Sequence, residues 1–182
     1  MIVLNRAGVT TQIPISLQKH GIPVHFLQEG DTLAIDSNVK FSVLHPPPNS
    51  QKDDMDSVDS NSTSLVLLIE HRGFRTLFAG DLETKNYSLD VPFLDTSPIH
   101  CPIILVPHHG GNSNLTQPLL DWTTPQTLMI SGGRFTYKEN VIQQFKQEGY
   151  TVFHTMLDGR IRVKIDYSGV ELDSFSGKKQ HF

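Results

Sequence analysis

One stretch decides how this chain is interpreted, residues 103–113, which reads Ile-Ile-Leu-Val-Pro-His-His-Gly-Gly-Asn-Ser. Its first four residues, 103–106, are apolar and predict a buried strand, which the proline ends. Two adjacent histidines follow, and two glycines allow a tight turn. Because imidazole is the commonest metal ligand in proteins, we interpret His108 and His109 as site residues at a rigid strand end. The alternative is a pair of surface histidines in a loop.

A second stretch places a carboxylate at another strand end. Leu77-Phe78-Ala79 ends an apolar run, and Gly80-Asp81-Leu82-Glu83 follows it. An aspartate and a histidine at strand ends are what a hydrolytic metal site draws from one half of a sheet. The alternative is that Asp81 only caps a short helix that begins at Leu82.

Length and composition fit one domain or a large piece of one. The chain has 182 residues, of which 37% are hydrophobic, so a real core is possible. The net charge of −4 gives no basic field for nucleic acid, so any such contact must be local or use a metal. The single cysteine, Cys101, excludes an internal disulfide and a cysteine-rich zinc site. No apolar run of about 18 residues predicts a membrane span.

Hydrophobic periodicity predicts a strand-rich chain with helices mostly in its second half. Strands are expected at 23–28, 32–35, 39–44, 64–70, 74–79, 103–106, 127–130, 150–154, 160–165 and 170–175, with a short apolar run at 1–4. Helices are expected at 13–21, 114–122 and 140–147. The fold class is therefore α/β (α+β), a mixed and mostly antiparallel sheet with helices on one face. We expect one unit over 1–175 and a frayed tail over 176–182.

The polar segment 49–62 is expected to be a mobile surface loop. It fails as a calcium loop starting at Asp54, because Asp59 replaces the turn glycine and Leu65 replaces the bidentate glutamate. His45 also ends a strand, but the three prolines after it form a rigid exit that explains the segment without chemistry.

Taken in order, segments from 13 to 171 resemble the metallo-β-lactamase-like domain of ComEC-type DNA-internalisation competence proteins. Each matching piece is weak alone, and the ordered set is specific. The pieces are Gly21-Ile22-Pro23-Val24, Glu29-Gly30-Asp31, Val43-Leu44-His45-Pro46, the segment 61–67, Ala79-Gly80-Asp81-Leu82-Glu83, Val106-Pro107-His108-His109-Gly110, Ser131-Gly132-Gly133, and Thr155 with Gly159 and Ile161.

The resemblance implies that this chain is part of a metallo-β-lactamase-like αββα sandwich. It implies that Asp81 bridges two metal ions and that His109 is the terminal histidine ligand, since the residue directly before the small glycine is the usual ligand. His108 then lies beside the ions or faces the substrate. The implied cofactor is a divalent metal, zinc or manganese, and the implied reaction is hydrolysis of one DNA strand during uptake.

Two departures from the family pattern qualify this expectation. The motif His-x-His-x-Asp-His, which supplies most of the ligands, is absent, although a zinc site takes about four ligands. We therefore expect the chain to be the C-terminal portion of the domain. By itself it is expected to be inactive, and it can be without bound metal. Tyr137-Lys138-Glu139 also stands where the family carries Tyr-Gly-His-Pro, so that histidine is missing.

Alternative functions stay open beside the hydrolase. One is a degenerate, non-catalytic scaffold next to a DNA transport channel, and another is a hydrolase of nucleotides or small esters. Expected partners are the missing N-terminal half of the domain, or a second copy bound through an uncovered apolar sheet face. In the intact protein, further expected partners are DNA and the membrane channel part of the same protein. The expected location is a soluble domain of a bacterial cell-membrane protein.

Overall fold

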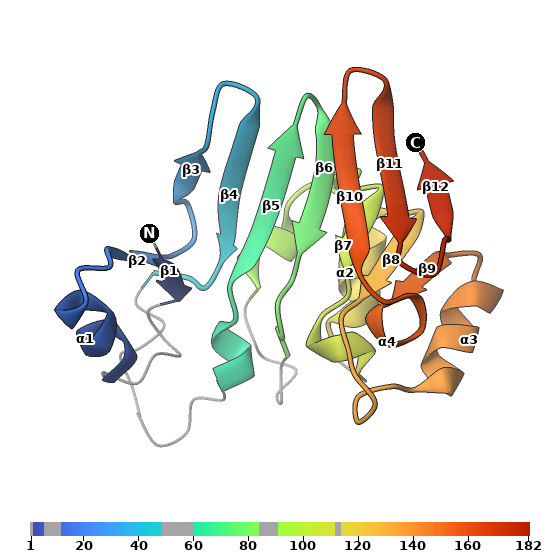
Figure 1. Cartoon of the computed structure of the whole chain (residues 1–182), viewed down its shortest axis with the longest axis horizontal. Coiled ribbons are helices and arrows are strands. Elements are labelled where there is room, and N and C mark those ends of the chain that lie inside the picture. Colours follow the sequence, from blue (N-terminus) through green and yellow to red (C-terminus); the bar gives the residue numbers. More distant parts are fainter. Residues whose placement is uncertain (1, 6–11, 49–59, 84–90, 112–113) are drawn as a thin grey trace.

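The computed structural model describes residues 2–5, 12–48, 60–83, 91–111 and 114–182. Most of the loop expected at 49–62 therefore lies outside the described residues, which resume at a short 3-10 helix, η1 (Ser60–Thr63). The main body is a seven-stranded sheet in the order β3-β4-β5-β6-β7-β8-β9 (Figure 1). Its strands are β3 (Thr32–Ala34), β4 (Val39–His45), β5 (Val66–His71), β6 (Phe74–Phe78), β7 (Ile103–Leu105), β8 (Thr127–Ile130) and β9 (Thr151–His154).

Strand direction divides this sheet into two parts. The strands β3 to β6 pair antiparallel, as the short turns between them require. The strands β6 to β9 pair parallel, so their carboxyl ends meet at one edge of the sheet. β4 runs in the same direction as β6, since both are antiparallel to β5, and it ends at that edge too.

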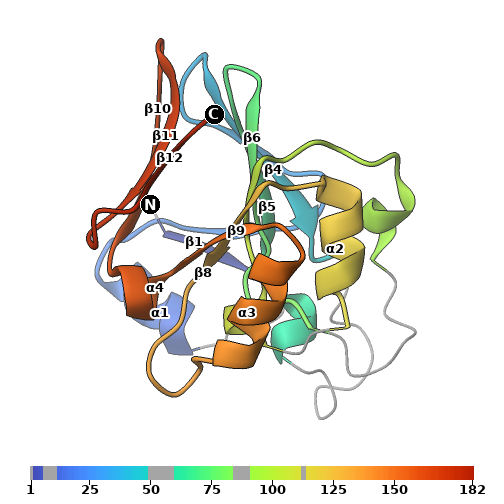
Figure 2. The same cartoon turned by 90° about the vertical axis from the view of Figure 1, so that its right-hand side faces the viewer.

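The helices α2 (Thr116–Thr123) and α3 (Glu139–Gln147) connect the parallel strands and cover one face of the sheet (Figure 2). α3 shows why the sequence folds this way, because Ile142 and Phe145 lie one turn apart and are both buried. The face below the helices holds the larger core cluster, whose fully buried members include Val66, Leu77, Leu82, Ile104, Leu119, Leu128 and Ile130.

A second, three-stranded antiparallel sheet packs on the opposite face (Figure 2). Its strands are β10 (Ile161–Asp166), β11 (Gly169–Ser174) and β12 (Lys179–His181). Ile103, Met129 and Phe153 of the main sheet meet Val170 and Leu172 in the smaller core cluster. The tail over 176–182 was expected to fray, and that prediction is wrong because β12 pairs with β11.

The remaining elements lie around these two sheets. The helix α1 (Gln12–Lys19) precedes β2 (Val24–Leu27), which pairs parallel with β1 (Ile2–Asn5). The 3-10 helices η2 (Pro92–Asp95) and η3 (His108–Gly110) and the short helix α4 (Thr155–Asp158) are connections. In the described part of the chain, no helix combines the length and the apolar character needed to cross a membrane.

On the outer edge of β9, the last strand of the main sheet, side chains form hydrogen bonds with the backbone. The Val152 carbonyl accepts a hydrogen bond from the Lys178 ammonium, and the His154 amide donates one to the Asp158 carboxylate at 2.8 Å. An unpaired strand edge is a template for joining another chain. This edge is therefore partly closed by the protein itself.

One patch of the main sheet, on the side that faces β10–β12, lies outside both core clusters. Phe41, Leu67 and Ile69, on β4 and β5, are half-buried and belong to neither core cluster of the described residues. The main-sheet residues in the smaller cluster come from β6 to β9 alone. We call Phe41, Leu67 and Ile69 the open face.

Candidate metal centre

The carboxyl ends of β6 and β7 bring together the two residues that the sequence singled out. Asp81 follows β6 and His109 lies in η3, directly after β7. Nε2 of His109 is 3.9 Å from Oδ1 of Asp81, and both side chains are partly exposed. The parallel pairing of β6 with β7 causes this meeting, because both chains leave the sheet at the same edge.

The imidazole of His109 is held in one orientation by the end of β8. Its Nδ1 lies 2.6 Å from the carbonyl oxygen of Ser131. Since a carbonyl can only accept, Nδ1 carries the proton and donates it, which leaves the lone pair on Nε2 facing Asp81. Proteins orient metal-binding histidines in this way.

The turn that carries the two histidines has an unusual backbone. His108 has a φ of +49° and His109 a φ of +55°, in the left-handed region that side chains rarely adopt. A Cβ on Gly111 would lie 2.8 Å from the carbonyl oxygen of His108. Glycine therefore fits at position 111, where any side chain would meet the backbone of His108. Strained backbone of this kind collects at functional sites.

His108 contacts a carboxylate that the sequence did not single out. Its Nδ1 lies 2.8 Å from Oε2 of Glu83, but this buried nitrogen makes no aligned hydrogen bond with any residue that the structure describes, so the contact is ionic when the ring is protonated. The amide of Asn61 donates to the same Oε2 at 3.4 Å. The only signal for Glu83 was its place two residues after Asp81.

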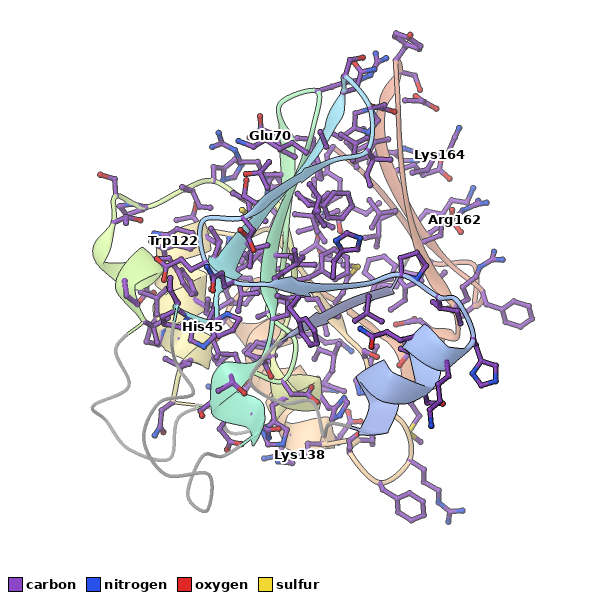
Figure 3. All side chains as sticks on the ribbon, turned by 90° about the vertical axis from the view of Figure 1, so that its left-hand side faces the viewer. His45, Glu70, Trp122, Lys138, Arg162 and Lys164 are labelled. Atoms are coloured by element: carbon purple, nitrogen blue, oxygen red, sulfur yellow. The ribbon has the colours of Figure 1, made fainter. Side chains whose placement is uncertain are left out.

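Two further histidines end strands at the same edge and are buried. His45 ends β4 and donates from Nε2 to the Ser62 carbonyl at 2.9 Å, while its Nδ1 has no hydrogen-bond partner among the described residues; Figure 3 labels it. His154 ends β9 and accepts from the Met156 amide at Nδ1. Burial lowers the pKa of both imidazoles. Sequence reasoning gave His45 no chemistry and missed His154, whose only signal was its strand-end position.

Asp81 and His109 fit two ligands of a divalent metal ion. Two donors of one tetrahedral ion lie about 3.4 Å apart when each metal bond is about 2.1 Å, close to the 3.9 Å between Nε2 and Oδ1. A complete site needs about four ligands. Among the residues that the structure places, no three or more His, Cys, Asp or Glu side chains form a group able to hold a metal.

The candidate centre lies apart from a hollow of about 510 Å³ in this structure. Glu29, Leu44, Phe93 and Trp122 contribute to the lining of this hollow. None of Asp81, His108 and His109 lines it. The candidate metal centre and this hollow are therefore separate features.

Comparison with known proteins confirms the resemblance to competence proteins. The chain is 26% identical to ComE operon protein 3 of Bacillus subtilis over 152 residues, which are 81% of this chain and 18% of that protein. It is 26% identical to Recombination protein 2 of Haemophilus influenzae over 116 residues, 62% of this chain and 14% of that protein. The chain thus spans less than a fifth of either relative. No protein-family model matches it.

Solved structures share the fold at low sequence identity. A variant of the CmlA β-hydroxylase has a TM-score of 0.50 and 10% identity, covering 78% of this chain and 34% of that one. A protein described as a metal-dependent hydrolase from Parabacteroides distasonis has a TM-score of 0.49 and 18% identity, covering 84% and 63%. The predicted fold class is confirmed, a mixed sheet of the metallo-β-lactamase type with few helices. The chain is therefore similar in sequence to two competence proteins and similar in fold to the CmlA variant.

Proposed function

We propose that residues 1–175 form the C-terminal portion of a divalent-metal hydrolase domain that cuts phosphodiesters, namely one DNA strand during uptake. The observation that carries this proposal is the pairing of Asp81 with His109 at 3.9 Å, with the His109 lone pair aimed at the carboxylate by Ser131. The sequence similarity to two competence proteins supports DNA as the substrate.

Each residue of the candidate metal centre has a role in this proposal. Asp81 and His109 hold the metal, zinc or manganese, which supplies a water activated for attack on the phosphorus. The Ser131 carbonyl keeps the His109 ring in place. The contact of His108 with Glu83 ties the turn after β7 to the turn after β6, so that the two ligands keep their spacing.

The remaining ligands come, in this proposal, from a His-x-His-x-Asp-His segment outside this chain. That segment belongs to the N-terminal half of the domain, whose sheet packs on the open face. The intact protein is a bacterial membrane protein in which this domain is soluble and the channel part passes DNA. This chain alone is then inactive.

A second candidate function is a non-catalytic scaffold beside the DNA channel. It is favoured by one observation, the lack of a group of three or more metal-ligating side chains within the described ranges. The strained, oriented histidine turn weighs against it, because a scaffold has no use for two consecutive histidines at positive φ.

Substitution of Asp81 tests the hydrolase. Asp81→Asn in the intact protein keeps the side-chain shape but loses the charge that holds the metal, and we expect at least a roughly 100-fold loss of manganese-dependent cleavage of a labelled single-stranded oligonucleotide. Asp121→Asn, an exposed carboxylate on α2, is the matched control and stays active. Unchanged cleavage in Asp81→Asn removes Asp81 from the site. No metal-dependent cleavage by the unmodified protein makes the scaffold the better hypothesis.

A further inference from the structure

The loop between β8 and α3 presents an aromatic ring entirely to solvent. Phe135 is 100% exposed, and the neighbouring Arg134 and Lys138 are exposed as well. The loop starts at Ser131, whose carbonyl holds His109, so it leaves the sheet at the edge of the candidate metal centre. Figure 3 labels Lys138 at the same end of the molecule as His45.

A second exposed aromatic lies beside the other end of α4. Thr155, at the start of α4, exchanges two hydrogen bonds of 2.8 Å with the backbone of Gly132, which joins α4 to the loop. Gly159, at the end of α4, lies against the side chain of Phe175, which is 81% exposed. We call the loop, α4 and Phe175 together the strip.

The strip has more cations than carboxylates. Within the described part of the chain, Arg134, Lys138 and Arg160 take part in no ion pair. Glu139 and Asp158 also lie here, and the neutral groups that donate hydrogen bonds to them leave their charges in place. Three cations and two carboxylates give the strip an excess of one positive charge, although the chain as a whole has a net charge of −4.

We propose that Phe135, Arg134 and Lys138 form a stacking platform for a single-stranded nucleic acid, extended by Phe175 and Arg160. Bases stack on the exposed rings while phosphates contact the cations, the combination that binds single strands without sequence preference. Its place beside Asp81 and His109 means that a strand on the platform is delivered to the metal centre. Delivery of the strand to the metal centre rests on the proposed function, whereas binding of the strand to the platform does not.

Strand binding without metal tests the platform. The purified protein is titrated, in EDTA, against fluorescein-labelled oligothymidylate, and anisotropy gives the affinity. Phe135→Ala is expected to weaken binding roughly five- to 100-fold, the value of one stacked base, while Phe135→Trp restores it. Tyr167→Ala is the matched control, since Tyr167 is 91% exposed in the turn between β10 and β11, and its affinity stays unchanged.

Salt dependence tests the cations separately. The double variant Arg134→Ala/Lys138→Ala is expected to reduce the slope of log affinity against log salt by about 1.4, since each phosphate contact on a single strand contributes about 0.7. Lys40→Ala, an exposed lysine on β4, leaves the slope as it was.

Two results overturn the platform. One is wild-type affinity in Phe135→Ala. The other is a changed oligomeric state of Phe135→Ala in sedimentation with unchanged oligonucleotide affinity, which makes the strip a protein-docking surface. Because the titration contains EDTA, it does not depend on the metal. Loss of cleavage in Asp81→Asn with unchanged oligonucleotide binding therefore does not contradict the platform. Conversely, loss of oligonucleotide binding in Phe135→Ala does not contradict the metal centre.

Discussion

The two left-handed histidines make the turn after β7 depend on the glycine that follows them. Gly110 has a φ of +72°, and a Cβ there would lie 3.2 Å from the side chain of Ile130. Gly110→Ala is therefore expected to lower the free energy of unfolding by about 1–3 kcal/mol. Gly133→Ala, where a Cβ meets nothing within 4 Å, is the control. Equal stability of the two variants in urea unfolding would contradict this account.

Buried histidines make the stability of the chain depend on pH. Burial lowers the pKa of His45 and His154 below the ordinary value of 6.5, although Glu29 and Asp158 oppose the shift. Below pH 6.5 the unfolded chain binds more protons than the folded chain, so the free energy of unfolding falls as the pH drops. The loss levels off below the lowered pKa values, and above about pH 7 these groups have no effect.

Urea unfolding between about pH 7 and pH 5 measures this dependence. The double variant His45→Gln/His154→Gln is expected to lose less stability over that interval than the unmodified chain, whatever its stability at pH 7. A slope as steep as that of the unmodified chain would show that other groups cause the acid sensitivity.

At single residues, the sequence singled out candidate side chains but not their contacts. Asp81 and His109 were recognisable because each follows an apolar run that ends in small or rigid residues. The contact of His108 with Glu83 depends on how two turns lie after the sheet has formed. The positive φ of both histidines likewise has no signature in a polar, non-glycine sequence.

At the scale of elements, the small sheet depends on the packing of β11 against the main sheet. Leu172 is fully buried in the smaller cluster, with Phe153 and Ile103. Leu172→Ala is expected to lower the free energy of unfolding by about 2–5 kcal/mol, through lost burial and a cavity. Lys179→Ala, exposed on β12, changes it by less than about 0.5 kcal/mol. A near-neutral Leu172→Ala in thermal or urea unfolding would mean that β10–β12 is not part of the cooperative unit.

The pattern of apolar residues made most strands and helices predictable. The elements that were missed form through tertiary contacts that leave no pattern in the sequence. β8 matches its predicted bounds, 127–130, because four apolar or β-branched residues lie between turn residues. β12 was missed because Lys-Gln-His has no strand pattern. It is ordered by pairing with β11 and by the hydrogen bond between Thr127 and Gln180.

For the whole molecule, the open face predicts association of the isolated chain. Phe41, Leu67 and Ile69 are only half-buried and lie outside both core clusters of the described residues, and exposed apolar area binds partners or dyes. We expect the isolated chain to self-associate or to bind an apolar dye, and Ile69→Lys to reduce both. Leu157→Lys is the control, because Leu157 is 49% exposed on α4, which follows β9 and is separated from β4 and β5 by the width of the sheet. A monodisperse monomer that binds no dye would contradict the prediction.

The hydrogen bonds on the edge of β9 limit the symmetry of any larger assembly. With Val152 and His154 already bonded to Lys178 and Asp158, the freer edge of the main sheet is β3, and that strand is three residues long. Two β3 edges that pair across a two-fold axis use up both. Growth of the main sheet through β3 therefore stops at a closed pair.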